Sequence, residues 1–125
     1  MVIQKIQLGR AGEKAAVDFL TRNGYQIAEQ NFRNKFGEID IIAYDGDVTC
    51  FIEVKTRNSD VFGSPLESVT LSKQRKIGQV ALSYLKSKGN SEVKARFDVV
   101  AVCLNGGQCR SVDLIKDAFD MNESY

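Results

Sequence analysis

The sequence of 125 residues contains no histidine. Histidine supplies the general base of the common catalytic triads and the nitrogen ligands of many zinc sites, so those classes of chemistry are excluded. Any catalysis must therefore use carboxylates, lysine or metal-bound water. Cysteine is scarce as well. Cys50, Cys103 and Cys109 form no CxxC pair and leave one thiol unpaired under any pairing scheme, so we expect reduced cysteines.

Long apolar runs and an excess of one charge are also absent. No apolar stretch approaches the length of a membrane span, and the N-terminal MVIQKIQLGR lacks the apolar region of a signal peptide. We therefore expect a cytoplasmic protein without membrane association. The net charge is +1, so any nucleic-acid binding must come from local clusters of Lys and Arg. Length and composition predict one domain over residues 1–125 with a hydrophobic core.

The stretch 36–58, FGEIDIIAYDGDVTCFIEVKTRN, predicts two strands joined by a tight turn at Asp45-Gly46. Strand alternation separates the residues by face. Charged side chains from both strands fall on one face: Glu38, Asp40, Glu53 and Lys55. Apolar side chains fall on the other: Ile39, Ile41, Ala43, Cys50, Ile52 and Val54.

The register of this hairpin brings carboxylates together. If Asp45 and Gly46 form the loop, Glu38 faces Glu53, and Asp40 and Glu53 are diagonal neighbours about 7 Å apart at Cα. Like charges opposite one another destabilise a sheet, and a divalent cation held by carboxylate oxygens is the simplest compensation. The alternative is a charged, solvated face of an edge hairpin. Clustered ionisable groups in two apolar strands favour the site.

Residues 9–23 predict a helix that presents one carboxylate on its apolar side. Glu13 lies on that side because Ala16 and Leu20 follow three and seven positions later. It is either an extra metal ligand beside the hairpin or a first-turn glutamate favoured by the helix dipole. Arg10, beside the helix start, is a candidate for contact with a phosphate or with Glu13.

The remaining segments predict strands over 25–32, 96–104 and 109–115, and a second helix from Thr70 or Ser72 to about Lys88. The order is helix, three strands, helix, two strands, which predicts a small mixed α/β sheet with helices against it. The first turns of the second helix carry three cations, which we expect to point elsewhere, while Gln74 faces the site.

Two further segments are candidates for substrate contact. Arg57 stands two residues past Lys55 and is suited to binding a phosphate. The loop SDVFGSPLESV holds the only proline, Pro65, and loops of this size often cover or clamp a substrate. We read Asp98 as structural and expect Phe119 to dock on the domain.

Several segments, taken in order, resemble one family: GRAGEKAAVDFL, NGYQI, NFRNKFGEIDIIA, FIEVKTR, FGSPLESV, RFDVVAV and DAF. They are similar to the YraN-like family of bacterial proteins, within the restriction-endonuclease-like PD-(D/E)xK superfamily, and more distantly to archaeal Holliday junction resolvases. The resemblance implies a restriction-endonuclease-like mixed sheet of about five strands flanked by helices. The proline of the superfamily motif is absent, since Ile39 precedes Asp40.

The resemblance also implies a nuclease site, with metal carboxylates at Asp40 and Glu53, a helix carboxylate at Glu13 and the active-site lysine at Lys55. The hypothesis is hydrolysis of phosphodiester bonds in nucleic acid, with branched or recombination-type DNA as one candidate substrate. Asp40, Glu53 and the carbonyl of Val54 would hold Mg²⁺ or Mn²⁺, and Glu13 would complete the ligand set.

Substrate contacts are expected from three residues: Arg10, Arg57 and Gln74. The likeness to resolvases implies a two-fold homodimer. Two alternatives to a nuclease stay open. One is a nucleic-acid-binding module without turnover, and the other is an interaction subunit of a DNA-processing complex.

Overall fold

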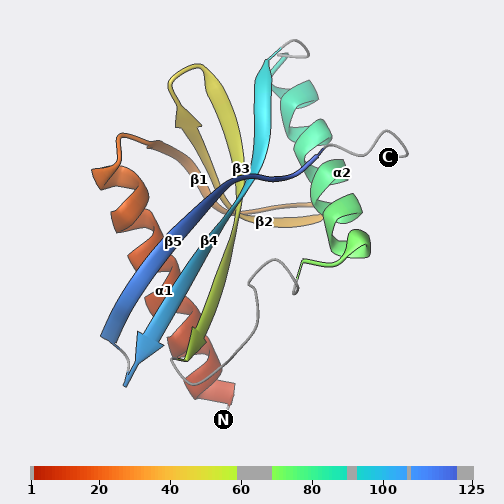
Figure 1. The fold of residues 1–125 in the computed structure, drawn as a ribbon. Helices are drawn as coiled ribbons and strands as arrows, with labels where there is room; N and C mark the ends of the chain where they lie inside the picture. Colours follow the sequence, from red (N-terminus) through yellow and green to blue (C-terminus); the bar gives the residue numbers. More distant parts are fainter. Residues whose placement is uncertain (1, 59–68, 90–92, 107, 121–125) are drawn as a thin grey trace.

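Five strands form one mixed sheet with a helix against each face (Figure 1). The structure, a computed structural model, describes residues 2–58, 69–89, 93–106 and 108–120. The elements are α1 (Val2–Arg22), β1 (Gln26–Asn34), β2 (Gly37–Asp45), β3 (Val48–Asn58), α2 (Leu71–Ser87), β4 (Lys94–Asn105) and β5 (Gln108–Phe119). The strands lie in sequence order, and only β3 and β4 are parallel. The predicted α/β class and order of elements are confirmed.

The sheet is buried on both faces at its centre. Helix α1 packs against a core that includes Ile41 and Ile52, and α2 packs against a second core that includes Phe51 and Phe97. The side chains of β3 therefore alternate between the two cores as predicted. Gly12 sets how closely α1 approaches the sheet, because a Cβ atom there would collide with the side chain of Thr56.

Helix α1 differs from the prediction at its start, whereas the predicted start of α2 is confirmed. Helix α1 begins at Val2 instead of Gly9, and no Ser, Thr, Asp or Asn stands before Gly9 to cap a later start. Helix α2 has Thr70 as its N-cap, and the Thr70 hydroxyl accepts a 3.2 Å hydrogen bond from the Lys73 amide. No helix in the described ranges is long and apolar enough to cross a membrane.

The C-terminal strand is longer than predicted. Strand β5 continues past Ile115 to Phe119, whose ring stacks on Phe97 with centroids 4.9 Å apart. The predicted docking of Phe119 is therefore confirmed. Residues 59–68, which include Pro65 and most of the predicted clamp loop, lie outside the described residues.

The β2–β3 turn is shifted from its predicted position. Asp45 pairs with Val48, so the two-residue loop is Gly46-Asp47 and the prediction of Asp45-Gly46 is wrong. Gly46 adopts a left-handed φ of 61°, which suits the first loop residue of a tight hairpin. Asp45 is drawn into the strand because its carboxylate bonds the Arg96 guanidinium at 2.9 Å. The shift is two residues, so no side chain of β3 changes face.

Candidate active site

The candidate site lies where β2 separates from β3. The ladder between these strands runs from Asp45–Val48 to Ile41–Ile52. Before Ile41, β2 follows β1 toward α2, and the alternation of faces breaks. Ile39 belongs to the α2-side core instead of the α1-side core, which corrects its predicted face.

The cause of this break is a local distortion shared by both strands of the β1–β2 hairpin. Asn31 has a left-handed φ of 53°, a conformation that asparagine tolerates better than most residues. The next paired residues, Phe32 and Ile39, both pack into the α2-side core. The Phe32 ring meets Tyr84 of α2 edge-on, with centroids 5.1 Å apart. The far end of the hairpin is therefore held against α2, as Figure 1 shows.

Asp40 occupies the split. Its Oδ2 atom accepts a 2.8 Å hydrogen bond from the backbone N–H of Val54, and thus takes the place of a strand partner. Because the N–H and C=O of one strand residue point to the same edge, the Val54 carbonyl also faces the split. Burial raises the pKa of Asp40, while the Val54 hydrogen bond and the nearby Lys73 and Lys55 lower it.

Glu53 lies beside Asp40 and is only 5% exposed. Burial and the neighbouring Asp40 carboxylate together raise its pKa to about 7, although Lys73 and Lys55 oppose the shift. Two acids of like charge therefore share one desolvated position. This is the arrangement expected of a functional site more often than of a structural one.

Two lysines face this pair of acids. Burial lowers the pKa of Lys55, and the adjacent Lys73 lowers it further, while Glu53 and Asp40 raise it. The Lys73 ammonium lies 3.7 Å from Glu53 Oε2. We call Asp40, Glu53, Lys55 and Lys73 the acid–lysine cluster.

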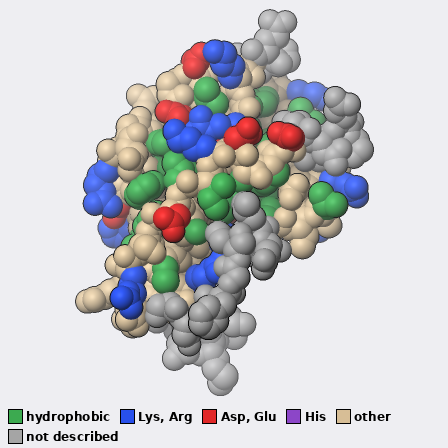
Figure 2. Space-filling view, viewed as in Figure 1, with side chains coloured by type: hydrophobic (Ala, Val, Ile, Leu, Met, Phe, Trp, Pro, Cys, Tyr) green, Lys and Arg blue, Asp and Glu red, His purple; other side chains and the backbone are tan. Residues whose placement is uncertain are grey.

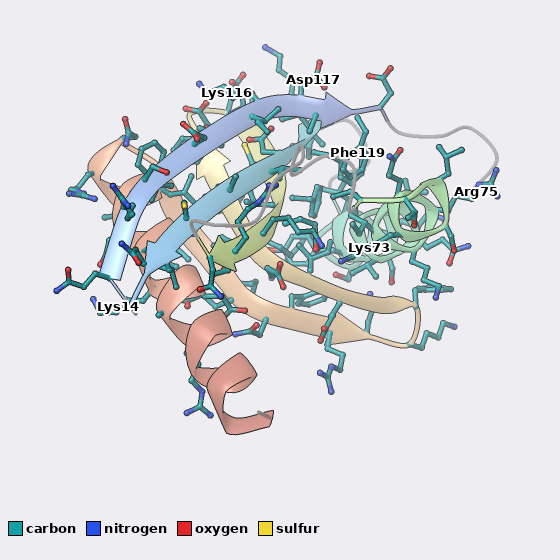
Figure 3. All side chains as sticks on the ribbon, turned by 60° about the horizontal axis from the view of Figure 1, so that its bottom comes forward. Lys14, Lys73, Arg75, Lys116, Asp117 and Phe119 are labelled. Atoms are coloured by element: carbon teal, nitrogen blue, oxygen red, sulfur yellow. The ribbon has the colours of Figure 1, made fainter. Side chains whose placement is uncertain are left out.

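Lys73 is the functional candidate that sequence reasoning missed. We expected all three cations of the first turns of α2 to point away. Instead Lys73 reaches toward the sheet while Arg75 points away from it (Figure 3). The signal was present in the helical period, since Lys73 precedes the buried Ile77 and Val80 by four and seven positions.

Glu13 and Glu38 are held outside the cluster. Glu13 Oε2 accepts a 3.3 Å hydrogen bond from the Asn31 side chain, and Asn31 stands next to the hairpin distortion. Glu38 forms an ion pair with Arg33 at 2.8 Å, and its side chain is largely exposed. The role of Glu13 as a metal ligand remains a prediction.

The three predicted substrate contacts are spread over the molecule. Arg10 is exposed on α1, and Arg57 is partly buried near the end of β3. Gln74 donates a 3.0 Å hydrogen bond to the Val69 carbonyl just ahead of α2. Their part in binding a substrate also remains a prediction.

The donor atoms at the split fit a hard divalent cation. Mg²⁺ commonly binds through one or two carboxylates together with waters and substrate phosphates. Asp40, Glu53 and the Val54 carbonyl supply such oxygens, and a cation would favour the ionised form of both acids. Among the described residues, no group of three or more Asp, Glu, Cys or His side chains is arranged to hold a metal ion by itself. The donor set therefore fits an open site and not a closed protein cage.

These features define an α/β protein with a five-stranded mixed sheet and a buried acid–lysine cluster at a split between two strands. The chain belongs to the family described as Uncharacterised protein family UPF0102, whose model matches residues 12–102. This is the YraN family, so the predicted resemblance is confirmed. The matched span includes Glu13 and the whole acid–lysine cluster.

Bacterial relatives match nearly the whole chain. A UPF0102 protein of Desulfosudis oleivorans is 50% identical over 122 residues, which cover 98% of this chain and 97% of the relative. One of Syntrophus aciditrophicus is 49% identical over 118 residues, with 94% and 92% covered. One of Thermodesulfovibrio yellowstonii is 47% identical over 115 residues, with 92% and 97% covered.

Proposed function

We propose that the protein is a metal-dependent nuclease that hydrolyses phosphodiester bonds in nucleic acid. The observation that supports this most is the desolvated pair of Asp40 and Glu53 at the split between β2 and β3. In a structural network, pairing with cations would lower the pKa of buried acids. Here burial raises the pKa of both acids, and the nearby lysines only oppose the shift. A site for a cation and a phosphate accounts for the arrangement.

Each residue of the cluster has a distinct part in this proposal. Asp40, Glu53 and the Val54 carbonyl would hold Mg²⁺ or Mn²⁺, which supplies Lewis acidity toward the phosphate and the attacking water. Lys55 has a lowered pKa, so its amine is suited to orienting or accepting a proton from the water. Lys73, on a different element, would contact the scissile phosphate and stabilise the charge that builds on it.

A cleavage panel tests the function. Branched, flapped and single-stranded DNA, together with RNA, would be incubated with the protein in Mg²⁺, Mn²⁺ and EDTA. We expect cleavage in Mg²⁺ or Mn²⁺ only, with Glu53→Gln and Lys55→Ala each reducing the rate by about a thousandfold or more, since cation and water both depend on them. The Asp47→Asn variant is the matched control, because Asp47 is an exposed acid of the same hairpin.

A separate measurement distinguishes a failed assay from a wrong site. Mn²⁺ titration by calorimetry should show binding to the wild type and to Asp47→Asn, and at least tenfold weaker binding to Glu53→Gln. Binding of nucleic acid without cleavage in any divalent metal would support the alternative of a module without turnover. Full activity in both cluster variants would refute the assignment.

A further inference from the structure

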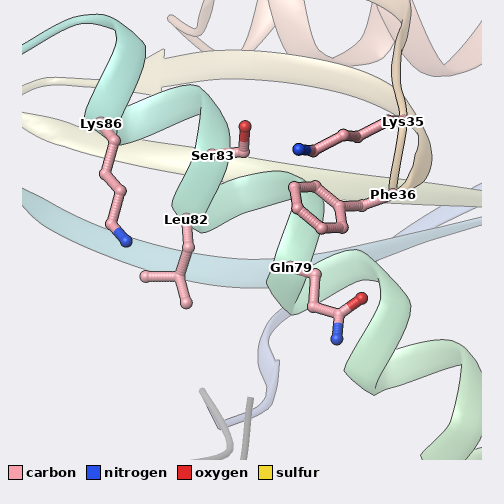
Figure 4. A pocket seen from close by; sticks show the side chains of 6 residues that line it. All are labelled: Lys35, Phe36, Gln79, Leu82, Ser83 and Lys86. Carbon is pink, nitrogen blue, oxygen red and sulfur yellow. The ribbon is translucent and has the colours of Figure 1, made fainter.

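A groove lies between the tip of the β1–β2 hairpin and the outer side of α2 (Figure 4). Its volume is about 380 Å³. It is lined by one aromatic ring, two cations and three small or uncharged side chains: Phe36, Lys35, Lys86, Gln79, Leu82 and Ser83. We call this the hairpin-tip groove.

Phe36 is unusual because its ring is 39% exposed at a hairpin tip. The Lys35 ammonium lies over one face of this ring, 5.2 Å from the centroid. Lys86 lines the groove from the last turn of α2, and none of the described lining side chains is acidic. A groove with an exposed ring and two lysines suits a ligand that combines a flat π-surface with negative charge.

The hairpin-tip groove has a neighbour that leads toward the acid–lysine cluster. A second groove of about 410 Å³ lies between the start of β2 and the first turns of α2, and Lys73 and Lys76 are among its lining residues. Both grooves use the same hairpin and the same helix. From Lys73 to Ser83 the helix rises roughly 15 Å. Among the described residues that line the second groove, the one acid is Glu38, which pairs with Arg33.

The face shown in Figure 2 mixes acidic and basic side chains among apolar ones. The two grooves instead combine three lysines of α2 with Lys35: Lys73, Lys76 and Lys86. A phosphate backbone would therefore meet positive charge along this side of α2.

We propose that the hairpin-tip groove binds an unpaired base of a nucleic-acid strand, with Phe36 as the stacking surface and Lys35 and Lys86 as phosphate contacts. The inference rests on the proposed nuclease function and specifies its substrate class. The substrate carries a single-stranded segment next to the bond that is cut. Stacking requires a base that is free of its duplex partner, and a ring at this position accepts any base.

Fluorescence anisotropy in EDTA tests the groove without cleavage. A labelled oligothymidylate of about 20 nucleotides and a duplex of the same length would be titrated with the full chain. We expect Phe36→Ala to weaken binding to the single strand roughly tenfold and binding to the duplex less than about twofold. Phe36→Tyr keeps the ring and should retain wild-type affinity.

Leu71, an exposed apolar residue at the start of α2, provides the matched control for Phe36. Leu71 is 64% exposed and does not line either groove, so Leu71→Ala should leave both affinities unchanged. Lys86→Gln should reduce the dependence of single-strand affinity on salt by about one phosphate contact. An unchanged circular dichroism spectrum would establish that each variant is folded.

Three results would overturn the proposal. They are equal losses for single strand and duplex in Phe36→Ala, no loss in Phe36→Ala, or no measurable single-strand affinity in the wild type. The last would favour a protein occupant of the groove. Because the measurement is made in EDTA, it stands apart from the cleavage panel. An inactive protein that stacks a base through Phe36 refutes the nuclease alone, and an active one indifferent to Phe36 refutes the groove alone.

Discussion

Two groups of ionisable side chains lie at opposite ends of β2, and acids in the two groups have pKa values that shift in opposite directions. At the turn end, Tyr25, Asp45, Arg96, Asp98 and Lys116 form what we call the Arg96 network. The Arg96 guanidinium bonds both Asp98 oxygens at 3.0 and 3.1 Å, Asp45 at 2.9 Å and the Tyr25 hydroxyl at 2.7 Å. At the split end lies the acid–lysine cluster, where the Lys73 ammonium is 3.7 Å from Glu53 Oε2.

The pKa shifts follow this difference. In the Arg96 network the hydrogen bond from Arg96 lowers the pKa of Asp45, and the acids raise that of Arg96 despite its partial burial. In the acid–lysine cluster, burial raises the pKa of both acids and lowers that of Lys55. Buried charges that are paired with opposite charges, as in the Arg96 network, are typical of a structural network. Buried acids whose charge is only partly balanced, as in the acid–lysine cluster, favour a functional site.

The largest expected effect is on stability, from breaking the Arg96 network. Asp98 is fully buried, and Arg96→Ala would remove its cationic partner and leave its carboxylate with the 2.9 Å hydrogen bond from the Asp117 amide and the contact with the Cys50 thiol. We expect unfolding free energy, measured in urea, to fall by about 3–5 kcal/mol. Adding Asp98→Asn to Arg96→Ala should recover part of that loss. A fall of less than about 1 kcal/mol would show that the network is not what stabilises this end.

The acid–lysine cluster should respond in the opposite sense. Glu53 has a pKa of about 7 in the folded chain and an ordinary value of 4.5. Its contribution to stability is therefore complete below pH 4.5 and is lost as pH rises through 7. In EDTA the wild type should lose on the order of 2–3 kcal/mol between about pH 5 and 8. Glu53→Gln carries no such proton, so it should become the more stable protein at pH 8.

Urea denaturation across this pH range measures the difference, with Asp47→Asn as the control that should follow the wild type. A gap between Glu53→Gln and the wild type that stays constant with pH would contradict the raised pKa. Asp40 adds to the same trend, because burial raises its pKa as well.

A smaller effect is expected from adding the cation itself. If Asp40 and Glu53 hold Mn²⁺, the ion offsets the cost of ionising them and stabilises the folded chain. At ten times its Kd, the gain is about 1.4 kcal/mol. The increase in Tm at pH 8 should appear in the wild type and be lost in Glu53→Gln. An equal increase in both proteins would place the bound cation elsewhere.

Much of this arrangement could be predicted from the sequence because it follows from periodicity. Alternation along β3 placed Glu53 and Lys55 on one face, and a register error of two residues left every face of β3 unchanged. The convergence of Asp40 and Glu53 was therefore robust to a wrong turn. Their roles in catalysis remain predictions.

The features that escaped prediction depend on contacts distant in sequence. The position of the β2–β3 turn depends on Asp45 meeting Arg96, which lies on β4. The change of face at Ile39 depends on the left-handed backbone of Asn31 and on packing against α2. Lys73 is different, because its position in the helical period was enough to predict that it faces the sheet, and the expectation that all three cations point elsewhere was wrong.

The smallest expected effect comes from an ion pair that resembles the Arg96–Asp45 pair in distance but is exposed to solvent. Lys94 and Arg96 stand two residues apart on β4, and each meets an acid at the β2–β3 turn. Lys94 lies 3.2 Å from Asp47, and Arg96 lies 2.9 Å from Asp45. The Lys94 side chain is 73% exposed, whereas that of Arg96 is 18% exposed. Lys94→Ala should therefore change the unfolding free energy by no more than about 0.5 kcal/mol, far less than Arg96→Ala. Comparable losses in the two variants would show that the distance between the charges, and not their burial, sets how much an ion pair contributes to stability in this protein.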